Sequence, residues 1–152
     1  MKTRTLLATA VMMAAFGALA KQPVDTGHGG AVATISHEAS QAAMEVLNAG
    51  GNAVDAPVAA AATLGVTEPF GCGIGGGGFF LLHEANTGKD VFIDAREIAP
   101  TAATPAAFLD AKGDLDRNRA ENGPWSAGIP GLPAALVHLS QNYGKLPLST
   151  TL

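Results

Sequence analysis

A glycine-rich run between residues 71 and 78 constrains the fold more than any other feature of this sequence. The pattern before the run is helical, and the pattern after it, from Phe79 to His83, is that of a strand. The run contains a literal G-x-G-x-x-G match, but a dinucleotide-binding loop needs a strand before it and a helix after it. The reversed order argues against a nucleotide site. Glycines suit a tight turn that another backbone or a small ligand approaches closely, and a simple packing loop is an alternative.

Two helices are predicted before the glycine-rich run. From residue 37, small apolar side chains recur at three- and four-residue spacing, and Gly50–Gly51 supplies a stop because glycine accepts the left-handed conformation of helix ends. Asn52 is a plausible N-cap for a second helix over residues 53–66, whose small apolar side chains predict burial on several sides. Pro57 fits only a first turn, so the second helix either begins later than expected or is bent there.

The remaining elements are short. Residues 31–35 alternate weakly and predict a strand, and Phe79–His83 and Val91–Ala95 predict a β-hairpin closed by a turn at residues 86–89. Beyond Pro100 the chain is rich in loop-forming residues until a last helix, which is predicted around residues 133–143. The expected order is therefore strand, helix, helix, glycine loop and hairpin.

Charge and composition exclude several classes of protein. The 152 residues fit one ordinary domain. The formal net charge is -4, with 9 Lys and Arg against 13 Asp and Glu, whereas nucleic-acid binding normally needs clustered cations. We therefore expect no nucleic-acid partner. A hydrophobic content of 47% argues against a disordered chain.

Residues 1–20 have the features of a secretory signal peptide. Lys2 and Arg4 form a positive start, residues 6–16 are mostly apolar, and Ala18-Leu19-Ala20 is a small-x-small cleavage site. The apolar run is shorter than the roughly 20 residues that span a bilayer. The sequence therefore predicts an exported protein, periplasmic or secreted, with no membrane span after signal cleavage.

The residue types that usually bind metals or act as nucleophiles form no convincing group. The four histidines lack metal-ligand spacing, so we expect no metal and no cofactor. Cys72 is the only cysteine, which excludes an internal disulfide, and no histidine is marked as its catalytic partner. Thr150 or Thr151 would act as an N-terminal nucleophile only after cleavage directly before it, which would leave a stub of two or three residues.

Arg96 is the candidate binding residue. It follows Asp94 at the end of the expected returning strand and precedes Glu97. A guanidinium at a strand end can bind a carboxylate through two parallel N–H bonds, a geometry that lysine cannot reproduce. An arginine between two acidic residues is more often simply ion-paired. The residues alone favour the ion pair.

Three segments together resemble one family. Residues 37–82, 92–104 and 126–148 are similar, in order, to the start of the large subunit of γ-glutamyltranspeptidases. The strings GGNAVDA, GIGGGGF and D-x-RE-x-AP, at these separations, are far more specific than a lone glycine motif. The resemblance covers nearly all of the chain after residue 20.

This resemblance implies an N-terminal-nucleophile hydrolase. The implied fold class is α/β (α+β), an αββα sandwich of which only the N-terminal part is present. Residues 21–152 would be a truncated N-terminal part of the large subunit. In the family, a proenzyme cleaves itself, and the new N-terminal Thr transfers or hydrolyses the γ-glutamyl group of glutathione. The arginine of D-x-RE, here Arg96, would bind the α-carboxylate of that group, which reverses the preference for a simple ion pair.

The same resemblance limits what this chain can do alone. The processing site and the nucleophilic Thr have no counterpart here, so no catalytic residue is assigned and the chain alone is predicted to be inactive. The expected partners are a γ-glutamyl substrate such as glutathione, the rest of the large subunit and the small subunit. Two alternatives remain open, namely a non-catalytic truncated remnant and part of a related glutaryl or cephalosporin acylase.

Overall fold

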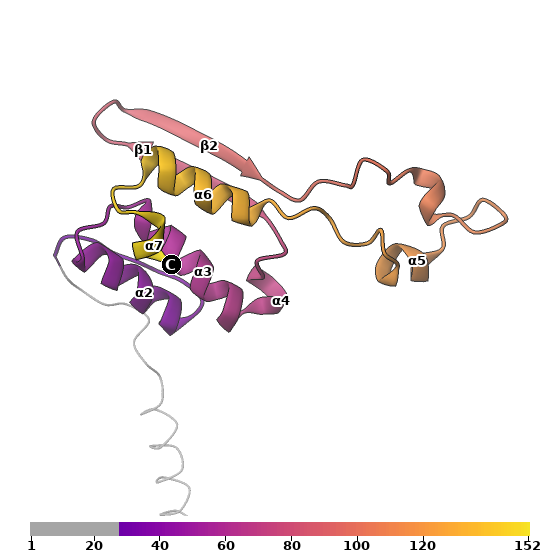
Figure 1. Cartoon of the computed structure of the whole chain (residues 1–152), viewed down its shortest axis with the longest axis horizontal. Helices are drawn as coiled ribbons and strands as arrows, with labels where there is room; N and C mark the ends of the chain where they lie inside the picture. Colours follow the sequence, from indigo (N-terminus) through magenta and orange to yellow (C-terminus); the bar gives the residue numbers. More distant parts are fainter. Residues whose placement is uncertain (1–27) are drawn as a thin grey trace, which may run out of the picture.

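The computed structural model describes residues 28–152. Helices and a β-hairpin form the body, and a long irregular segment extends away from it (Figure 1). The elements in chain order are α2 (His37–Asn48), α3 (Asp55–Thr67), α4 (Pro69–Cys72), β1 (Gly78–Glu84), β2 (Lys89–Ala95), the 3-10 helix η1 (Pro105–Phe108), α5 (Arg117–Asn122), α6 (Leu132–Tyr143) and α7 (Leu148–Thr151). The expected signal peptide lies outside the described residues. Within the described residues, no helix combines the length and the apolar character that a membrane crossing requires.

The first helix, α2, forms where its apolar periodicity predicts it. Ser36 caps its start, because its hydroxyl oxygen accepts a hydrogen bond from the Ala39 N–H at 3.3 Å. The Ser36 hydroxyl also donates to Glu38 at 2.7 Å, and this hydrogen bond lowers the pKa of that carboxyl below its ordinary value. Gly50 follows the helix with a φ of +93°, as expected of a glycine stop.

The second helix, α3, begins at Asp55, so Pro57 lies in its first turn without bending it. The N-cap residue is Val54 and not the predicted Asn52, but the Asn52 side-chain oxygen still accepts from the N–H groups of Val54 and Asp55 at 2.8 and 2.9 Å. The first half of α3 is buried, but Val66 near its end is exposed. The expectation of burial on several sides is therefore met only in the first half.

A buried carboxylate connects the start of α3 to the loop after α6. Asp55 has no exposed surface, and its oxygens accept hydrogen bonds from the N–H groups of Asn52, Lys145 and Leu146 at 2.8 to 3.4 Å. The Asn52 amide also donates to the Tyr143 carbonyl at 2.7 Å. A buried charge is stable only when it is satisfied in this way, so these contacts fix α3 against the end of α6.

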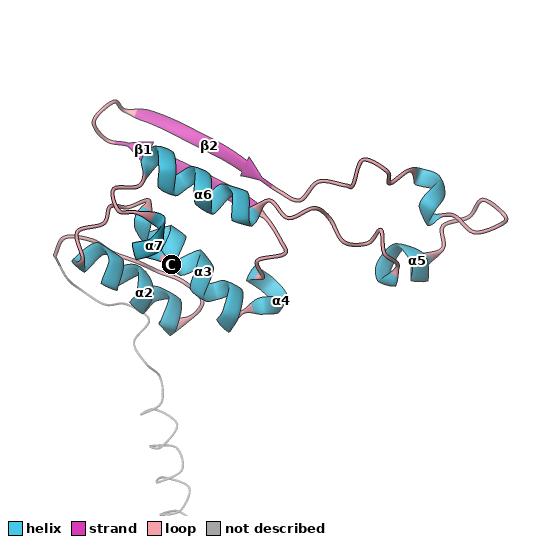
Figure 2. Ribbon diagram, viewed as in Figure 1, coloured by secondary structure: helices cyan, strands magenta, loops and turns pink. Residues whose placement is uncertain are grey.

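The hairpin packs one face on the helices. The strands β1 and β2 pair antiparallel in the register Phe79 opposite Asp94 and Leu81 opposite Phe92, and they are the whole of the sheet within the described residues. Phe80 and Ile93 point to the other face, where they contact a buried cluster of Val58 from α3 and leucines of α6. Figure 2 shows α6 running beside the hairpin, on the side where α2, α3 and α7 also lie, whereas α5 lies in the extended segment. Phe79, Leu81 and Phe92 therefore form an exposed apolar face.

A second core lies between α2 and α3. Four buried alanines of these helices pack together, with larger apolar side chains at the edge of the cluster. Small side chains let the two helix backbones approach closely, as the alanine-rich sequence predicts. The four alanines are Ala39, Ala43, Ala56 and Ala60.

Two sequence predictions were wrong in detail. Residues 31–35 form no strand, because within the described residues their backbone makes no ladder of hydrogen bonds with another segment. The sequence predicts a loop from residue 71, but Gly71 and Cys72 belong to one helical turn that starts at Pro69, in which the Cys72 N–H donates to the Glu68 carbonyl at 2.8 Å. Proline suits the first turn of a helix because it has no N–H to satisfy there.

Candidate functional site

The glycine-rich run is a packing loop around the end of β2. A side chain at Gly77 would overlap the carbonyl oxygen of Ala95, and one at Gly131, just before α6, would overlap the same oxygen. The Gly76 carbonyl accepts hydrogen bonds from the N–H groups of Gly131 and Leu132, both at 3.1 Å. Three separate segments therefore meet at Ala95 with their backbones almost in contact. This arrangement needs glycine for close approach and not for a left-handed turn.

The segment after β2 is fixed by the same crowding. Ile98 and Ile129 exchange backbone hydrogen bonds at 2.8 and 3.3 Å in an isolated antiparallel bridge. A side chain at Gly128 would meet the Cβ atom of Glu97. Residues 96 and 97 are thereby held between the glycine-rich run and residues 128–131, although they lie beyond the end of the strand.

Arg96 leaves this crowded point with its side chain exposed. Its backbone N–H donates to the Asp94 carboxylate at 3.0 Å, which fixes the turn out of β2. The side chain is 59% exposed, and its Nε atom lies 3.1 Å from Oε2 of Glu97. Its Cζ atom lies 5.9 Å from the centre of the Phe79 ring. The ion pair that the residues alone favour is present, but it leaves more than half of the Arg96 side chain exposed.

Glu97 is the more buried member of this ion pair. Its side chain is 27% exposed, and Oε2 itself has almost no solvent contact. Within the described residues no well-directed hydrogen bond reaches Oε2, so its contact with Arg96 is electrostatic in character. A carboxylate in this position favours a cation beside it, and Arg96 supplies that cation.

The other candidates from the sequence are not brought together. Cys72 is exposed at the end of α4, not buried as a small hydrophobic residue. His83 pairs with Asp90 at 2.8 Å on the exposed side of the hairpin, and His138 contacts Asn142 in the next turn of α6. Among residues 28–152, no group of histidine, cysteine and acidic side chains has the arrangement of a metal site.

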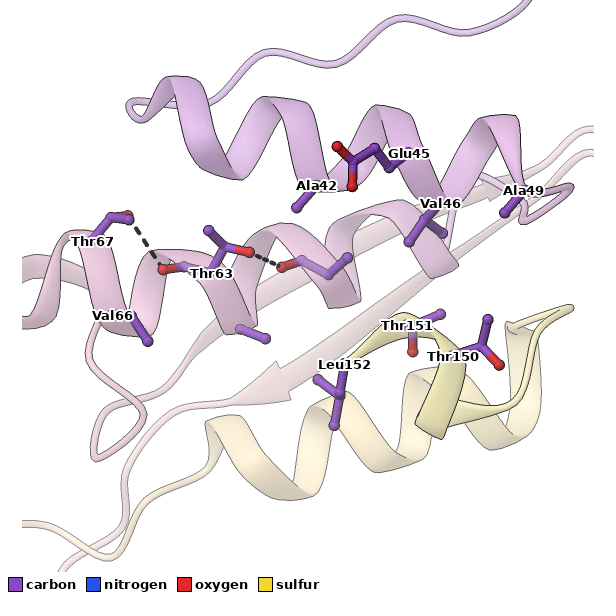
Figure 3. Close-up of a pocket in the computed structure, with 12 residues that line it drawn as sticks. Ala42, Glu45, Val46, Ala49, Thr63, Val66, Thr67, Thr150, Thr151 and Leu152 are labelled. Carbon is purple, nitrogen blue, oxygen red and sulfur yellow. Dashed lines mark hydrogen bonds between the residues drawn. The ribbon is translucent and has the colours of Figure 1, made fainter.

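One surface cavity is formed without Arg96. It has a volume of about 610 Å³ and lies between α2, α3 and α7 (Figure 3). Two of its hydroxyl groups are already used, because Thr63 donates to the Ala59 carbonyl at 2.9 Å and Thr67 donates to the Thr63 carbonyl at 3.3 Å. Its remaining lining is mostly alanine and valine. The lining also includes the Glu45 carboxylate and the hydroxyl groups of Thr150 and Thr151, so the cavity is mixed in polarity.

Comparisons with known proteins agree with this arrangement. The family model for γ-glutamyltranspeptidase matches residues 39–152. A glutathione hydrolase proenzyme from Pseudomonas aeruginosa is 46% identical over 124 residues, which are 82% of this chain and 22% of that protein. This chain thus spans about a fifth of the length of the curated relatives that it matches.

Solved structures of γ-glutamyltranspeptidases and of a related acylase are also similar to this chain. The crystal structure of Helicobacter pylori γ-glutamyltranspeptidase matches with a TM-score of 0.80 and 39% identity, over 85% of this chain and 37% of that chain. A cephalosporin acylase from Bacillus halodurans matches with a TM-score of 0.68 and 33% identity, over 88% of this chain and 25% of that chain.

The solved structures that this chain matches have the mixed α and β fold of a class of protein, the N-terminal-nucleophile hydrolases, and this chain forms a part of that fold. Within that class, the family is settled by the match over residues 39–152. The chain belongs to the γ-glutamyltranspeptidase family. The expected family and fold class are confirmed.

Proposed function

We propose that this chain is the N-terminal part of a γ-glutamyltransferase or glutathione hydrolase, and that Arg96 binds the α-carboxylate of the γ-glutamyl group. The complete enzyme transfers that group from a substrate such as glutathione to water or to an amino acid. This chain contributes substrate binding. The nucleophile, an N-terminal Thr formed by self-cleavage, belongs to the small subunit.

One observation carries this proposal. The Arg96 backbone lies in the crowded packing around Ala95, and the Arg96 side chain is 59% exposed. The contact with Glu97 uses the Nε atom. The terminal nitrogens are the pair that bind a carboxylate through two parallel hydrogen bonds. An arginine with a closely packed backbone and a largely exposed side chain suits recognition better than stabilisation of the fold.

The exposed face of the hairpin supports the proposed partners. Phe79, Leu81 and Phe92 present large apolar side chains on one side of the sheet. A sheet face of this kind is normally covered by a second layer. We propose that the rest of the large subunit and the small subunit provide this layer, completing the αββα sandwich. Residues 1–20 act as a signal peptide that directs the protein to the periplasm or the cell exterior.

A hybrid enzyme tests the proposal. In it, residues 39–152 replace the matching part of the Pseudomonas aeruginosa glutathione hydrolase proenzyme, to which this chain is similar. We expect the hybrid to hydrolyse γ-glutamyl amides. The Arg96→Lys variant should raise the KM for these donors roughly 10- to 100-fold, because hydrogen bonds to charged groups contribute about 1.5–3 kcal/mol each. A correctly folded hybrid with an unchanged KM in Arg96→Lys would contradict the proposal.

The likeness to a cephalosporin acylase supports a second candidate function. A glutaryl group carries a carboxylate in the same position as a γ-glutamyl group and lacks only the amino group. Arg96 therefore fits both, and the rest of the site must distinguish them. If the hybrid cleaved glutaryl amides with a higher kcat/KM than γ-glutamyl amides, the acylase function would be preferred.

A further inference from the structure

The outer face of the hairpin carries two stacked aromatic rings beside Arg96. The ring centres of Phe79 and Phe92 are 5.4 Å apart with an angle of 29° between the ring planes. In the strand register, Phe79 is opposite Asp94 and Phe92 is opposite Leu81, so the two rings are diagonal neighbours on one face. Arg96 follows Asp94 by two residues, and its Cζ atom lies 5.9 Å from the centre of the Phe79 ring.

Phe79 is not needed for the core beneath the hairpin. The neighbouring Phe80, which points to the opposite face, packs against the leucines of α6, whereas Phe79 is 59% exposed. The ring of Phe79 has Phe92 on one side and the Arg96 guanidinium within cation–π distance. The Phe79 ring thus has a stacked aromatic ring and a cation among its neighbours.

We propose that Phe79 is a positioning residue for substrate binding, because its ring holds the Arg96 guanidinium in place for the carboxylate. This inference rests on the proposed function and extends it. Glu97 lies beside the Nε edge of the guanidinium, and the guanidinium Cζ atom lies over the Phe79 ring. The terminal nitrogens remain for a carboxylate. A guanidinium that already has few orientations loses less conformational entropy when the substrate binds.

The same contact connects two sequence motifs that are 17 residues apart, Phe79 at the end of GIGGGGF and Arg96 in DAREIAP. The register of β1 and β2 brings the two residues together across the hairpin. The glycine-rich run allows the close approach of backbones at Ala95, which sets the point where Arg96 leaves the sheet. The aromatic residue after the glycines then has a role that a merely apolar side chain would not fill.

Steady-state kinetics of the hybrid enzyme test this proposal. Phe79→Leu keeps an apolar side chain but removes the ring. This variant should raise the KM for γ-glutamyl amides about two- to fivefold, which is the effect of losing one exposed cation–π contact. Its kcat should change less than about twofold, because the contact acts on binding. Phe79→Tyr keeps the ring and should behave like the unaltered hybrid. Lys112→Ala is the control, since Lys112 is an exposed charged residue in the segment after η1, away from the hairpin, and should leave both constants unchanged.

A second donor separates positioning from a general structural role. A 4-aminobutyryl amide lacks the α-carboxylate, so Phe79→Leu should change its kcat/KM less than twofold, in line with the small size of a single cation–π contact. An unchanged KM for γ-glutamyl amides in Phe79→Leu would overturn the proposal, as would an equal loss for both donors or a Phe79→Tyr variant that resembles Phe79→Leu. If Arg96→Lys also had no effect, the proposed function itself would fail. An effect of Arg96→Lys alone would reject only the role of Phe79.

Discussion

The Arg96 side chain shows how a residue beyond the end of a strand becomes fixed. The Asp94 carboxylate binds its backbone N–H at 3.0 Å, and Glu97 lies 3.1 Å from its Nε atom. Both contacts are made by residues next to Arg96 in the sequence, so the string DAREIAP is enough to suggest them. The third contact, with Phe79, comes from the opposite strand and depends on the hairpin register.

Asp55 is the other residue whose surroundings determine its role. It carries a buried charge and has no exposed surface. Its carboxylate accepts hydrogen bonds from the N–H groups of Lys145 and Leu146, about 90 residues further along the chain. The sequence suggests only a favourable negative charge near a helix start. The long-range contacts were not predictable, because no local pattern marks the loop at residues 144–146 as their donor.

For Asp55, we predict that Asp55→Asn in the hybrid enzyme loosens the loop after α6. The Asn side chain has no negative charge and turns N–H groups toward backbone N–H donors, so these donors lose hydrogen bonds to a charged group. Such hydrogen bonds contribute about 1.5–3 kcal/mol each. The backbone N–H groups of Lys145 and Leu146 should then exchange with deuterium roughly 10- to 100-fold faster. Mass spectrometry of the peptide that contains these two residues measures this rate. Asp90→Asn on the exposed hairpin surface is the control. Unaltered exchange in both variants would show that Asp55 does not hold this loop.

At the scale of elements, local patterns predicted the helices and the hairpin well. The first helix, the hairpin strands and the last long helix lie within a few residues of their expected positions, because apolar periodicity and glycine stops are local signals. The expected strand at residues 31–35 failed because a strand needs a partner that its own sequence does not specify. The helical turn at Pro69 was missed because the glycines beyond it suggested a loop throughout.

The role of the glycine-rich run was only partly predictable. The order of helix and strand excludes a nucleotide loop, and the sequence already indicates close backbone approach as the remaining reason for glycines. The partners in that approach, Ala95 and the segment before α6, become visible only in the structure. Gly128 and Gly131 lie more than thirty residues from β2, so no short motif connects them with Arg96.

Two glycines in the same loop test this account of the packing. Gly77→Ala would place a side chain on the Ala95 carbonyl and the Arg96 backbone, and overpacking of this kind costs about 1–3 kcal/mol. We expect a lower melting temperature of the hybrid enzyme and a raised KM for γ-glutamyl amides, since Arg96 would shift. At Gly75 an added side chain meets no atom within 4 Å, so Gly75→Ala should leave both values unchanged. Equal behaviour of the two variants would contradict the packing account.

At the scale of the whole molecule, the apolar surface is distributed unevenly. One face of the hairpin is packed on α6 and α3, and the other exposes Phe79, Leu81 and Phe92. Two strands also leave their outer edges without hydrogen-bond partners in the described part of the chain. Exposed apolar faces and open strand edges favour association and weaken independent folding.

We therefore predict that this chain, produced on its own, folds poorly. Hydrogen exchange should show weak protection in β1 and β2, because these strands have only one packed face. The helix pair α2 and α3 should be better protected, since a cluster of buried alanines joins it. Uniformly strong protection across both parts would refute this prediction.

The central claim is that Arg96 binds a carboxylate, and a crystal structure of the hybrid enzyme with a bound γ-glutamyl compound tests it most directly. The account predicts that the α-carboxylate oxygens lie within about 2.7–3.2 Å of the terminal nitrogens of Arg96. It also predicts that the Phe79 ring remains under the guanidinium. A bound γ-glutamyl group whose carboxylate is held elsewhere, with Arg96 still paired only to Glu97, would contradict the account.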